Sequence, residues 1–293
     1  MPSECGRELQ VMRRMTRRLY ENFFMPCRLP EYAELLELAL GKGYAVLSVE
    51  NYLKMLKNRR TVGKCLVLRH DVDSDVETAR HMLDIEEKLG VHASYYFRLQ
   101  TVDKGFMQRI VRMGGESGYH FEEIATFIKM YGLKTRAEVT RFLPAIRDAF
   151  SRNLLSLRAD TGLPIRIVAS HGDWANRRLG IFNYELLNDE LRTKLAIEAE
   201  AYDLPLTQGI TSRISDSPYP VFWNPMDPQV PLNDGSPIVY ILTHPRHWAS
   251  NVVENLRIDL MRVQEACRYH WSTKVLGTRL LRDDSHVVPD GPA

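Results

Sequence analysis

The sequence predicts an α/β fold built on a parallel β-sheet, and two observations support this prediction. Short apolar runs alternate with amphipathic segments of helical length from about residue 66 to residue 248, which is the pattern of repeated strand–helix units. Several of these runs also end in an aspartate or a histidine. Because the carboxyl ends of parallel strands share one face, such residues are expected to gather there.

Residues 1–60 predict a helical extension packed on this domain. Between Glu8 and Phe24, an apolar stripe of Met12, Met15 and Leu19 predicts an amphipathic helix, with four arginines mostly off the stripe. We favour a helix that packs on the domain and exposes its basic face to water. The alternative is an interfacial helix that makes weak peripheral contact with anionic lipid.

The main domain is predicted over residues 61–282 as a parallel sheet or a barrel, followed by a tail over residues 283–293. The helix after Asp73 is expected to start with a capping box of Ser74 and Glu77 and to end at Gly90. The predicted strands cover residues 44–49, 66–73, 92–97, 117–122, 165–172, 210–214 and 238–245. The predicted helices cover residues 32–40, 76–89, 106–113, 136–152 and 251–269.

The composition excludes several classes of protein. The chain has 293 residues and a formal net charge of +2, so the molecule as a whole is not built to coat nucleic acid. Its apolar runs fall short of the ~18 residues that indicate a transmembrane helix, and its N-terminus lacks the apolar core of a secretory signal. The four cysteines are scattered, which indicates reduced thiols rather than a disulfide framework or a zinc ribbon. We therefore expect a cytoplasmic location.

The strongest candidate site is the end of the strand at residues 66–73. Asp71 and Asp73 stand two residues apart, so on an extended chain both side chains point to the same face. Two adjacent carboxylates are costly unless a positive charge lies between them, and a divalent metal is the usual solution. His70 falls on the opposite face and is expected to be buried structure.

Four more polar residues follow apolar strands, namely His120, His171, Asp216 and His244. A single histidine at a strand end is more often a structural hydrogen-bonding residue than a metal ligand. The repetition of the pattern at several strand ends favours one shared site at the carboxyl face of the sheet.

From about Leu66 to Trp248, the chain resembles the polysaccharide deacetylase family, which has the NodB-homology fold of the carbohydrate esterases of family 4. The His-Asp-Val-Asp at 70–73 is similar to the first family motif, in its Asp-x-Asp variant. The stretches 89–97, 118–120 and 242–244 resemble the second strand, the histidine motif and the closing Leu-x-His motif. This resemblance implies a distorted (β/α)7 barrel.

The resemblance also implies a role for each matching residue. Asp71 would be the general base, Asp73 and His120 would bind the metal, and His244 would be the general acid. Asp216 stands where the family orients its catalytic groups.

The chain departs from the family pattern in its ligand set. The family places a second histidine four residues after the first, where this chain has Ile124. The third ligand is then His171 or Glu122, since both belong to strand ends. With His171 the site would hold one carboxylate and two imidazoles, which suits Zn²⁺ or Fe²⁺, and Zn²⁺ is the expected ion. The Arg-x-Pro-Tyr motif of the family is not evident.

Three residues are predicted to contact the substrate. Arg98 offers a guanidinium that pairs with an acidic neighbour or holds a phosphate. Trp223 and Trp248 offer rings on which a sugar can stack, although a core position is an equal alternative for Trp248.

Together these features predict a metal-dependent N-deacetylase-like hydrolase. Its substrate would be an acylated amino sugar, nucleotide- or lipid-linked, in carbohydrate or surface-polysaccharide biosynthesis. One alternative is a metal-dependent glycosyltransferase, in which the Asp-x-Asp at 71–73 holds a nucleotide sugar. Another is a catalytically inactive sugar-binding homologue.

Overall fold

The computed structural model describes residues 16, 19–20, 22–59, 63–217 and 222–279. Its centre is one sheet of eight strands, and the strands described in it all pair in parallel. The strands are β1 (Ala45–Leu47), β2 (Cys65–Val72), β3 (Ser94–Phe97), β4 (Glu116–Phe121), β5 (Ile167–Ser170), β6 (Ala199–Glu200), β7 (Ser212–Ser215) and β8 (Ile238–Thr243).

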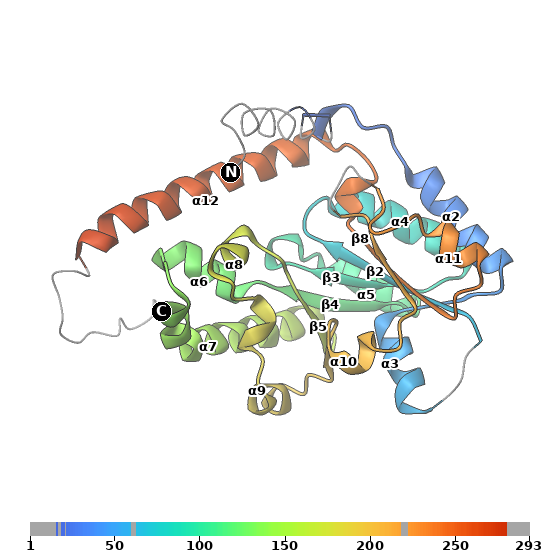
Figure 1. Ribbon diagram of the computed structural model, residues 1–293, viewed down its shortest axis with the longest axis horizontal. Helices are drawn as coiled ribbons and strands as arrows, with labels where there is room; N and C mark the ends of the chain where they lie inside the picture. The colour runs from blue at the N-terminus through green and yellow to red at the C-terminus, as the bar shows by residue number, and fades with distance from the viewer. Residues whose placement is uncertain (1–15, 17–18, 21, 60–62, 218–221, 280–293) are drawn as a thin grey trace, which may run out of the picture.

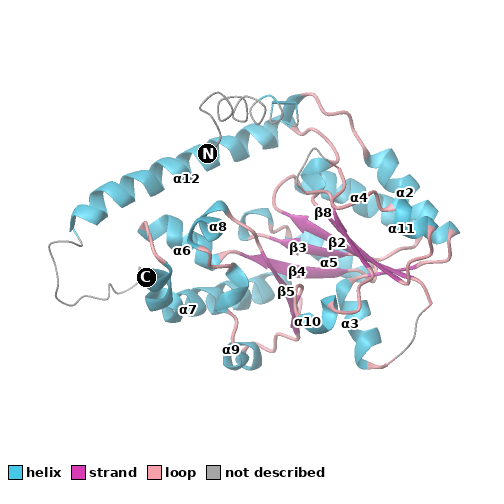
Figure 2. Cartoon of the chain, viewed as in Figure 1, coloured by secondary structure: helices cyan, strands magenta, loops and turns pink. Residues whose placement is uncertain are grey.

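The spatial order of the strands is β6-β5-β4-β3-β2-β8-β7, with β1 beside β2. Among the described residues no pairing joins β6 to β7, so the seven-stranded barrel is open between its two edge strands. Helices surround this sheet (Figure 2). The predicted distorted (β/α)7 barrel is confirmed.

The helices lie mostly in the connections between strands. They are α2 (Leu29–Gly41), α3 (Val49–Lys57), α4 (Val76–Leu89), α5 (Lys104–Arg112), α6 (Glu123–Tyr131), α7 (Arg136–Thr161), α8 (Trp174–Leu179), α9 (Asp189–Lys194), α10 (Leu204–Thr207), α11 (Gln229–Asn233) and α12 (Val252–Arg279), with short 3₁₀ turns at Leu99–Thr101, Asn183–Leu186 and Pro245–His247. None of the described helices is both long and apolar enough to cross a lipid bilayer.

Residues of β2 alternate between two apolar clusters. Leu66 and Leu68 belong to the large outer cluster, which the surrounding helices complete. Val67 belongs to a smaller inner cluster between the strands, α3 and α10. Because successive side chains of a strand point to opposite faces, Arg69 and Asp71 continue the inner face. The inner face therefore changes from apolar to charged toward the carboxyl end of the strand.

A glycine in β4 makes room for the inner cluster. A Cβ atom at Gly118 would lie 2.4 Å from the Tyr96 ring, which is closer than real Cβ contacts. Tyr96 is fully buried and donates a hydrogen bond to Glu116 Oε1 at 2.8 Å. A larger residue at position 118 would therefore displace the tyrosine from the barrel interior.

The helix boundaries of α4 and α7 are among those that differ from the sequence prediction. The predicted capping box of Ser74 and Glu77 is wrong, because Asp75 is the N-cap of α4 and accepts a hydrogen bond from the Thr78 amide at 3.2 Å. The helix ends at Gly90 (φ 65°), as predicted. The helix predicted over 136–152 runs nine residues further, because apolar residues of α7 remain buried on one face as far as its last turn.

The long helix α12 lies above the sheet in Figure 1 and packs against α6. Ile258 of α12 is buried, and Tyr269 donates a hydrogen bond to the Leu133 carbonyl at 3.3 Å. The helix also contacts the first part of the chain, because Asn22 donates a hydrogen bond to Asp259 Oδ2 at 2.7 Å.

The first and last segments of the predicted domain organisation lie largely outside the residues that the structure describes. This holds for most of the helix predicted over residues 8–24 and for the tail over residues 283–293. The contact of the helix predicted over residues 8–24 with lipid stays a prediction. Within residues 1–60, β1 pairs with β2, so this segment supplies a strand to the sheet as well as helices.

Candidate metal centre and active site

Three predicted ligands meet at the carboxyl end of the sheet. Asp73 follows β2, His120 lies near the end of β4 and His171 follows β5. Asp73 Oδ1 lies 3.4 Å from His120 Nε2 and 3.5 Å from His171 Nε2. One ligand atom from each residue lies within 4.8 Å of the others. Strands far apart in the sequence therefore bring one carboxylate and two imidazoles together.

The donor set fits a divalent metal ion. Asp73 Oδ1 is buried and has no hydrogen-bond partner among the described residues, although a buried polar atom without a partner is costly. His120 Nδ1 lies 3.0 Å from the Ala169 carbonyl oxygen, and donation of its proton to that oxygen leaves Nε2 free to bind an ion. One carboxylate with two imidazoles and open positions suits Zn²⁺ or Fe²⁺.

Glu122 lies behind His171, which bears on the choice of third ligand. His171 Nδ1 lies 3.2 Å from Glu122 Oε2, and Arg98 donates to Glu122 Oε1 from Nε at 3.0 Å. Burial raises the pKa of Glu122, but the hydrogen bond with His171 and the charge of Arg98 outweigh burial and lower the pKa to about 2. A charged Glu122 orients the imidazole of His171 toward Asp73. The geometry therefore favours His171 as the ligand and Glu122 as its support.

Arg69 balances the charge of Asp71. Both side chains are buried in the barrel interior, and the guanidinium donates to both carboxylate oxygens, at 2.7 and 2.8 Å. Burial raises the pKa of Asp71, but Arg69 and the nearby His120 lower it overall. Asp71 is therefore ionised beside the metal group, which consists of the three predicted ligands Asp73, His120 and His171. Asp71 Oδ2 lies 3.5 Å from His120 Nε2. Arg69 stands two residues before Asp71, and this spacing was the sequence signal that the two side chains share a face.

A second polar cluster lies at the ends of β7 and β8. His244 Nδ1 lies 2.7 Å from Asp216 Oδ1, and the His244 amide donates to Asp216 Oδ2 at 2.7 Å. Burial lowers the pKa of His244, but the Asp216 carboxylate raises it to about 9. His244 is therefore protonated at neutral pH, and its charge in turn lowers the pKa of both Asp71 and Asp73.

His247 belongs to the same cluster, although the sequence prediction omitted it as a site residue. Its Nδ1 lies 3.4 Å from Asp216 Oδ1, and its ring centroid lies 5.1 Å from that of His244. Its position three residues after His244, on the same turn, was the available signal.

The predicted substrate contacts divide into two groups. Arg98 lines a cavity beside Asp73 and His171. Trp223 and Trp248 do not line that cavity; their rings pack together with centroids 5.6 Å apart. Trp248 is only 1% exposed and donates to Asp216 Oδ2 at 3.2 Å. The prediction that Trp248 stacks on substrate is thus corrected, because its ring has almost no free surface.

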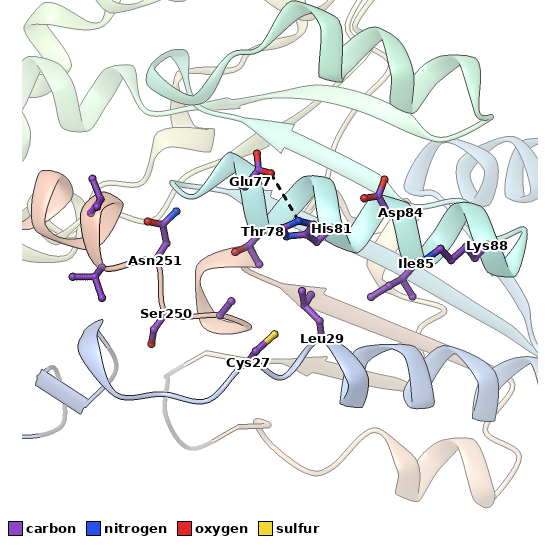
Figure 3. Close-up of a pocket in the computed structure, with 13 residues that line it drawn as sticks. Cys27, Leu29, Glu77, Thr78, His81, Asp84, Ile85, Lys88, Ser250 and Asn251 are labelled. Atoms are coloured by element: carbon purple, nitrogen blue, oxygen red, sulfur yellow. Dashed lines mark ion pairs between the residues drawn. The ribbon is translucent and has the colours of Figure 1, made fainter.

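A separate groove lies away from these clusters (Figure 3). It runs between α4 and the segments around Cys27 and Ser250, and its volume is about 640 Å³. Two of the residues that line it are Glu77 and His81, whose Oε1 and Nε2 atoms lie 3.8 Å apart. None of the predicted site residues lines this groove.

Comparison with known proteins gives structural neighbours only. No protein-family model matches the sequence, and no curated protein matches it significantly. Several solved structures are similar to this chain, and among them are proteins described as CE4 family members. This is the family that the sequence motifs resemble.

Three of these solved structures illustrate the likeness. BA3943 of Bacillus anthracis, a CE4 family pseudoenzyme, is 18% identical, with 70% of this chain and 63% of that chain covered and a TM-score of 0.40. The peptidoglycan deacetylase PdaC of Bacillus subtilis is 15% identical, with 75% and 96% covered and a TM-score of 0.39. IcaB of Ammonifex degensii is 16% identical, with 58% and 74% covered and a TM-score of 0.41. The chain spans less than two thirds of the length of the BA3943 chains, 63–65%.

Proposed function

We propose that this protein is a metal-dependent hydrolase that removes the acyl group from an acylated amino sugar. The observation that carries the proposal is the arrangement of the two clusters. The group of Asp73, His120 and His171 can hold a metal, with an ionised Asp71 beside it. A protonated His244 lies near enough to lower the pKa of both Asp71 and Asp73. A base and an acid with separated pKa values near a bound metal are what hydrolysis of an amide requires.

When bound by Asp73, His120 and His171, a divalent ion such as Zn²⁺ would lower the pKa of a water molecule and polarise the acyl carbonyl.

The side chains of the protein would supply the proton transfers. Asp71 accepts a proton from the attacking water at a carboxylate oxygen, and the Arg69 guanidinium fixes its orientation through two hydrogen bonds. Water oxygen adds to the acyl carbon and the carbon–nitrogen bond breaks. His244 donates its proton to the leaving nitrogen, so the products are a carboxylate and an amine. Asp216 holds the imidazole of His244 and stabilises its charge.

The amino sugar is the less direct part of this proposal. It rests on the resemblance of the motifs at 70–73, 118–120 and 242–244 to the polysaccharide deacetylases. We propose a substrate from carbohydrate or surface-polysaccharide biosynthesis and a cytoplasmic site of action on the same ground.

The test is acetate release from N-acetylated amino sugars by the purified protein loaded with Zn²⁺, with metal content measured by mass spectrometry. We expect Asp71→Asn to keep its metal and lose about 10²–10⁴-fold in activity, the usual contribution of a general base. Asp73→Ala should lose both metal and activity.

Two outcomes contradict the proposal. If Asp73→Ala retains full metal content, the assignment of the centre is wrong. If the loaded protein releases no acetate and instead transfers sugar from a nucleotide sugar with Mn²⁺, the protein is a glycosyltransferase.

A further inference from the structure

A cavity opens directly beside the metal group. Its volume is about 600 Å³, and Asp73 and His171 line one end. Residues of α8 and α12 complete its wall. This is the size of site that takes a small molecule, and a ligand in it would touch the predicted ligand set.

The carboxylates around this cavity already have cationic partners. Lys129 Nζ lies 3.2 Å from Asp173 Oδ2 and 2.9 Å from Glu265 Oε2. Glu122, just behind the wall, pairs with Arg98. These carboxylates therefore do not repel a negatively charged ligand as strongly as their number suggests, and Asp73 would be neutralised by a bound cation.

One arginine of the wall, Arg177, is not used by these carboxylates. Arg177 of α8 is exposed, and its guanidinium makes no hydrogen bond or ion pair with any residue that the structure describes. Arg262 enters the wall from α12. Guanidinium groups match the geometry of phosphate oxygens and bind them with charge-assisted hydrogen bonds.

An aromatic ring lies next to Arg177. Trp174, three residues earlier on α8, lines the same cavity and is 36% exposed. Tyr269 of α12 supports the ring edge to face, with centroids 5.2 Å apart at 80°. An indole that is held in place and partly exposed offers the apolar surface on which a sugar ring packs.

We propose that this cavity binds a sugar that carries a phosphoryl group, with the phosphoryl group against Arg177 and the sugar ring against Trp174. The placement of the acylated amino group of this sugar at the metal end of the cavity rests on the proposed function. The phosphoryl group can belong to a sugar monophosphate or to the diphosphate of a nucleotide sugar, and the experiment separates these sources.

The test measures binding by isothermal titration calorimetry on the Zn²⁺-loaded protein, independently of turnover. The probes are N-acetylglucosamine, its 1-phosphate and its uridine diphosphate ester. We expect the better phosphorylated probe to bind at least about tenfold more tightly than the neutral sugar, because charge-assisted hydrogen bonds form. Which of the two phosphorylated probes binds more tightly identifies the source of the phosphoryl group.

The ratio of affinities is then compared between variants. Arg177→Ala should reduce the advantage of the phosphorylated probe by about tenfold or more. Arg166→Ala should keep it, because Arg166 is equally an exposed arginine but pairs with Glu198 outside this cavity. Thermal melting confirms that each variant folds.

Equal binding of neutral and phosphorylated sugars, or an unchanged ratio in Arg177→Ala, overturns this inference. Failure of the proposed function shows differently, as the absence of acetate release from every N-acetylated sugar regardless of its phosphate.

Discussion

At the scale of single residues, Asp216 controls the protonation of His244. The carboxylate lies 2.7 Å from His244 Nδ1 and raises the pKa of the imidazole to about 9, against the effect of burial. If His244 is the general acid, activity requires its protonated form, and activity falls as the pH rises through that pKa.

We therefore expect Asp216→Asn to move the alkaline limb of the kcat/KM profile toward lower pH by about two units, since the imidazole loses its anionic partner. Activity at pH 8 should fall more than activity at pH 6. The measurement is a pH–rate profile for both proteins. An alkaline limb that stays in place would remove His244 from the role of acid.

Glu122 is the second residue whose effect passes through a neighbour. It holds His171 Nδ1 at 3.2 Å while Arg98 holds Glu122. Replacing such a support typically weakens metal binding by about 10–100-fold. We expect this loss in Glu122→Gln, measured by competition with a Zn²⁺ chelator.

Glu77→Gln is the matched control for Glu122→Gln, because Glu77 also pairs with a histidine but lies in the separate groove. Its Zn²⁺ affinity should equal that of the unmodified protein. If Glu122→Gln binds Zn²⁺ normally as well, His171 does not depend on this carboxylate.

At the scale of elements, a buried glutamate joins β4, α6 and α7. Glu123 Oε1 accepts hydrogen bonds from Tyr119 Oη at 2.5 Å and Asn153 Nδ2 at 3.0 Å, while Oε2 has no hydrogen-bond partner among the described residues. Burial raises the pKa of Glu123 to about 7, which the two hydrogen bonds only partly oppose. Protonation at low pH removes the buried negative charge of this carboxylate.

The consequence is a pH-dependent stability. Because the folded state holds this proton more tightly than the unfolded state, the contribution of Glu123 is complete below a pH of about 4.5 and is lost as the pH rises through about 7. The size is on the order of 3 kcal/mol, at 1.36 kcal/mol per pKa unit. In Glu123→Gln, an amide replaces the protonated acid, so the free energy of unfolding should depend less on pH over this interval.

The measurement is denaturant unfolding of both proteins at several values of pH between 4.5 and 8. The two curves should diverge in slope in this interval. Parallel curves would show that Glu123 is ionised in the folded protein at neutral pH.

Several strands and the shared face of the site residues could be predicted from the sequence alone. The alternation of strands and helices predicted β2, β4, β5 and β8 closely, because each is an apolar run that ends in a polar residue. The position of Asp73, His120 and His171 at one face followed from the parallel sheet. The distances between them did not, since they depend on how β4 and β5 pair.

Other features had no local signal. Asp75 was not expected as the cap of α4, because its left-handed backbone (φ 54°) depends on the turn that follows β2. The cavity wall formed by α8 and α12 depends on packing between elements far apart in the sequence, which a periodic pattern does not encode. For the same reason the sequence left open whether the Trp248 ring stacks on substrate or belongs to the core, and the structure places it in the core.

At the scale of the whole molecule, the metal centre ties distant parts of the sheet together. Asp73, His120 and His171 follow three different strands, and β3 separates β2 from β4 in the sheet. The unfolded chain cannot hold these three side chains together, so an ion that binds them binds the folded state in preference. Such binding stabilises the fold by mass action.

We expect Zn²⁺ at about 100 times its dissociation constant to add about 2.7 kcal/mol to the free energy of unfolding. For a domain of this size, that corresponds to a rise in Tm of roughly 5–10 °C. The measurement is thermal unfolding of the metal-free protein with increasing Zn²⁺, and removal of the ion with a chelator should reverse the rise. Asp73→Ala should show no rise, whereas Asp71→Asn should keep it, because Asp71 pairs with Arg69 rather than the ion. A rise of equal size in Asp73→Ala would place the stabilising ion elsewhere in the protein.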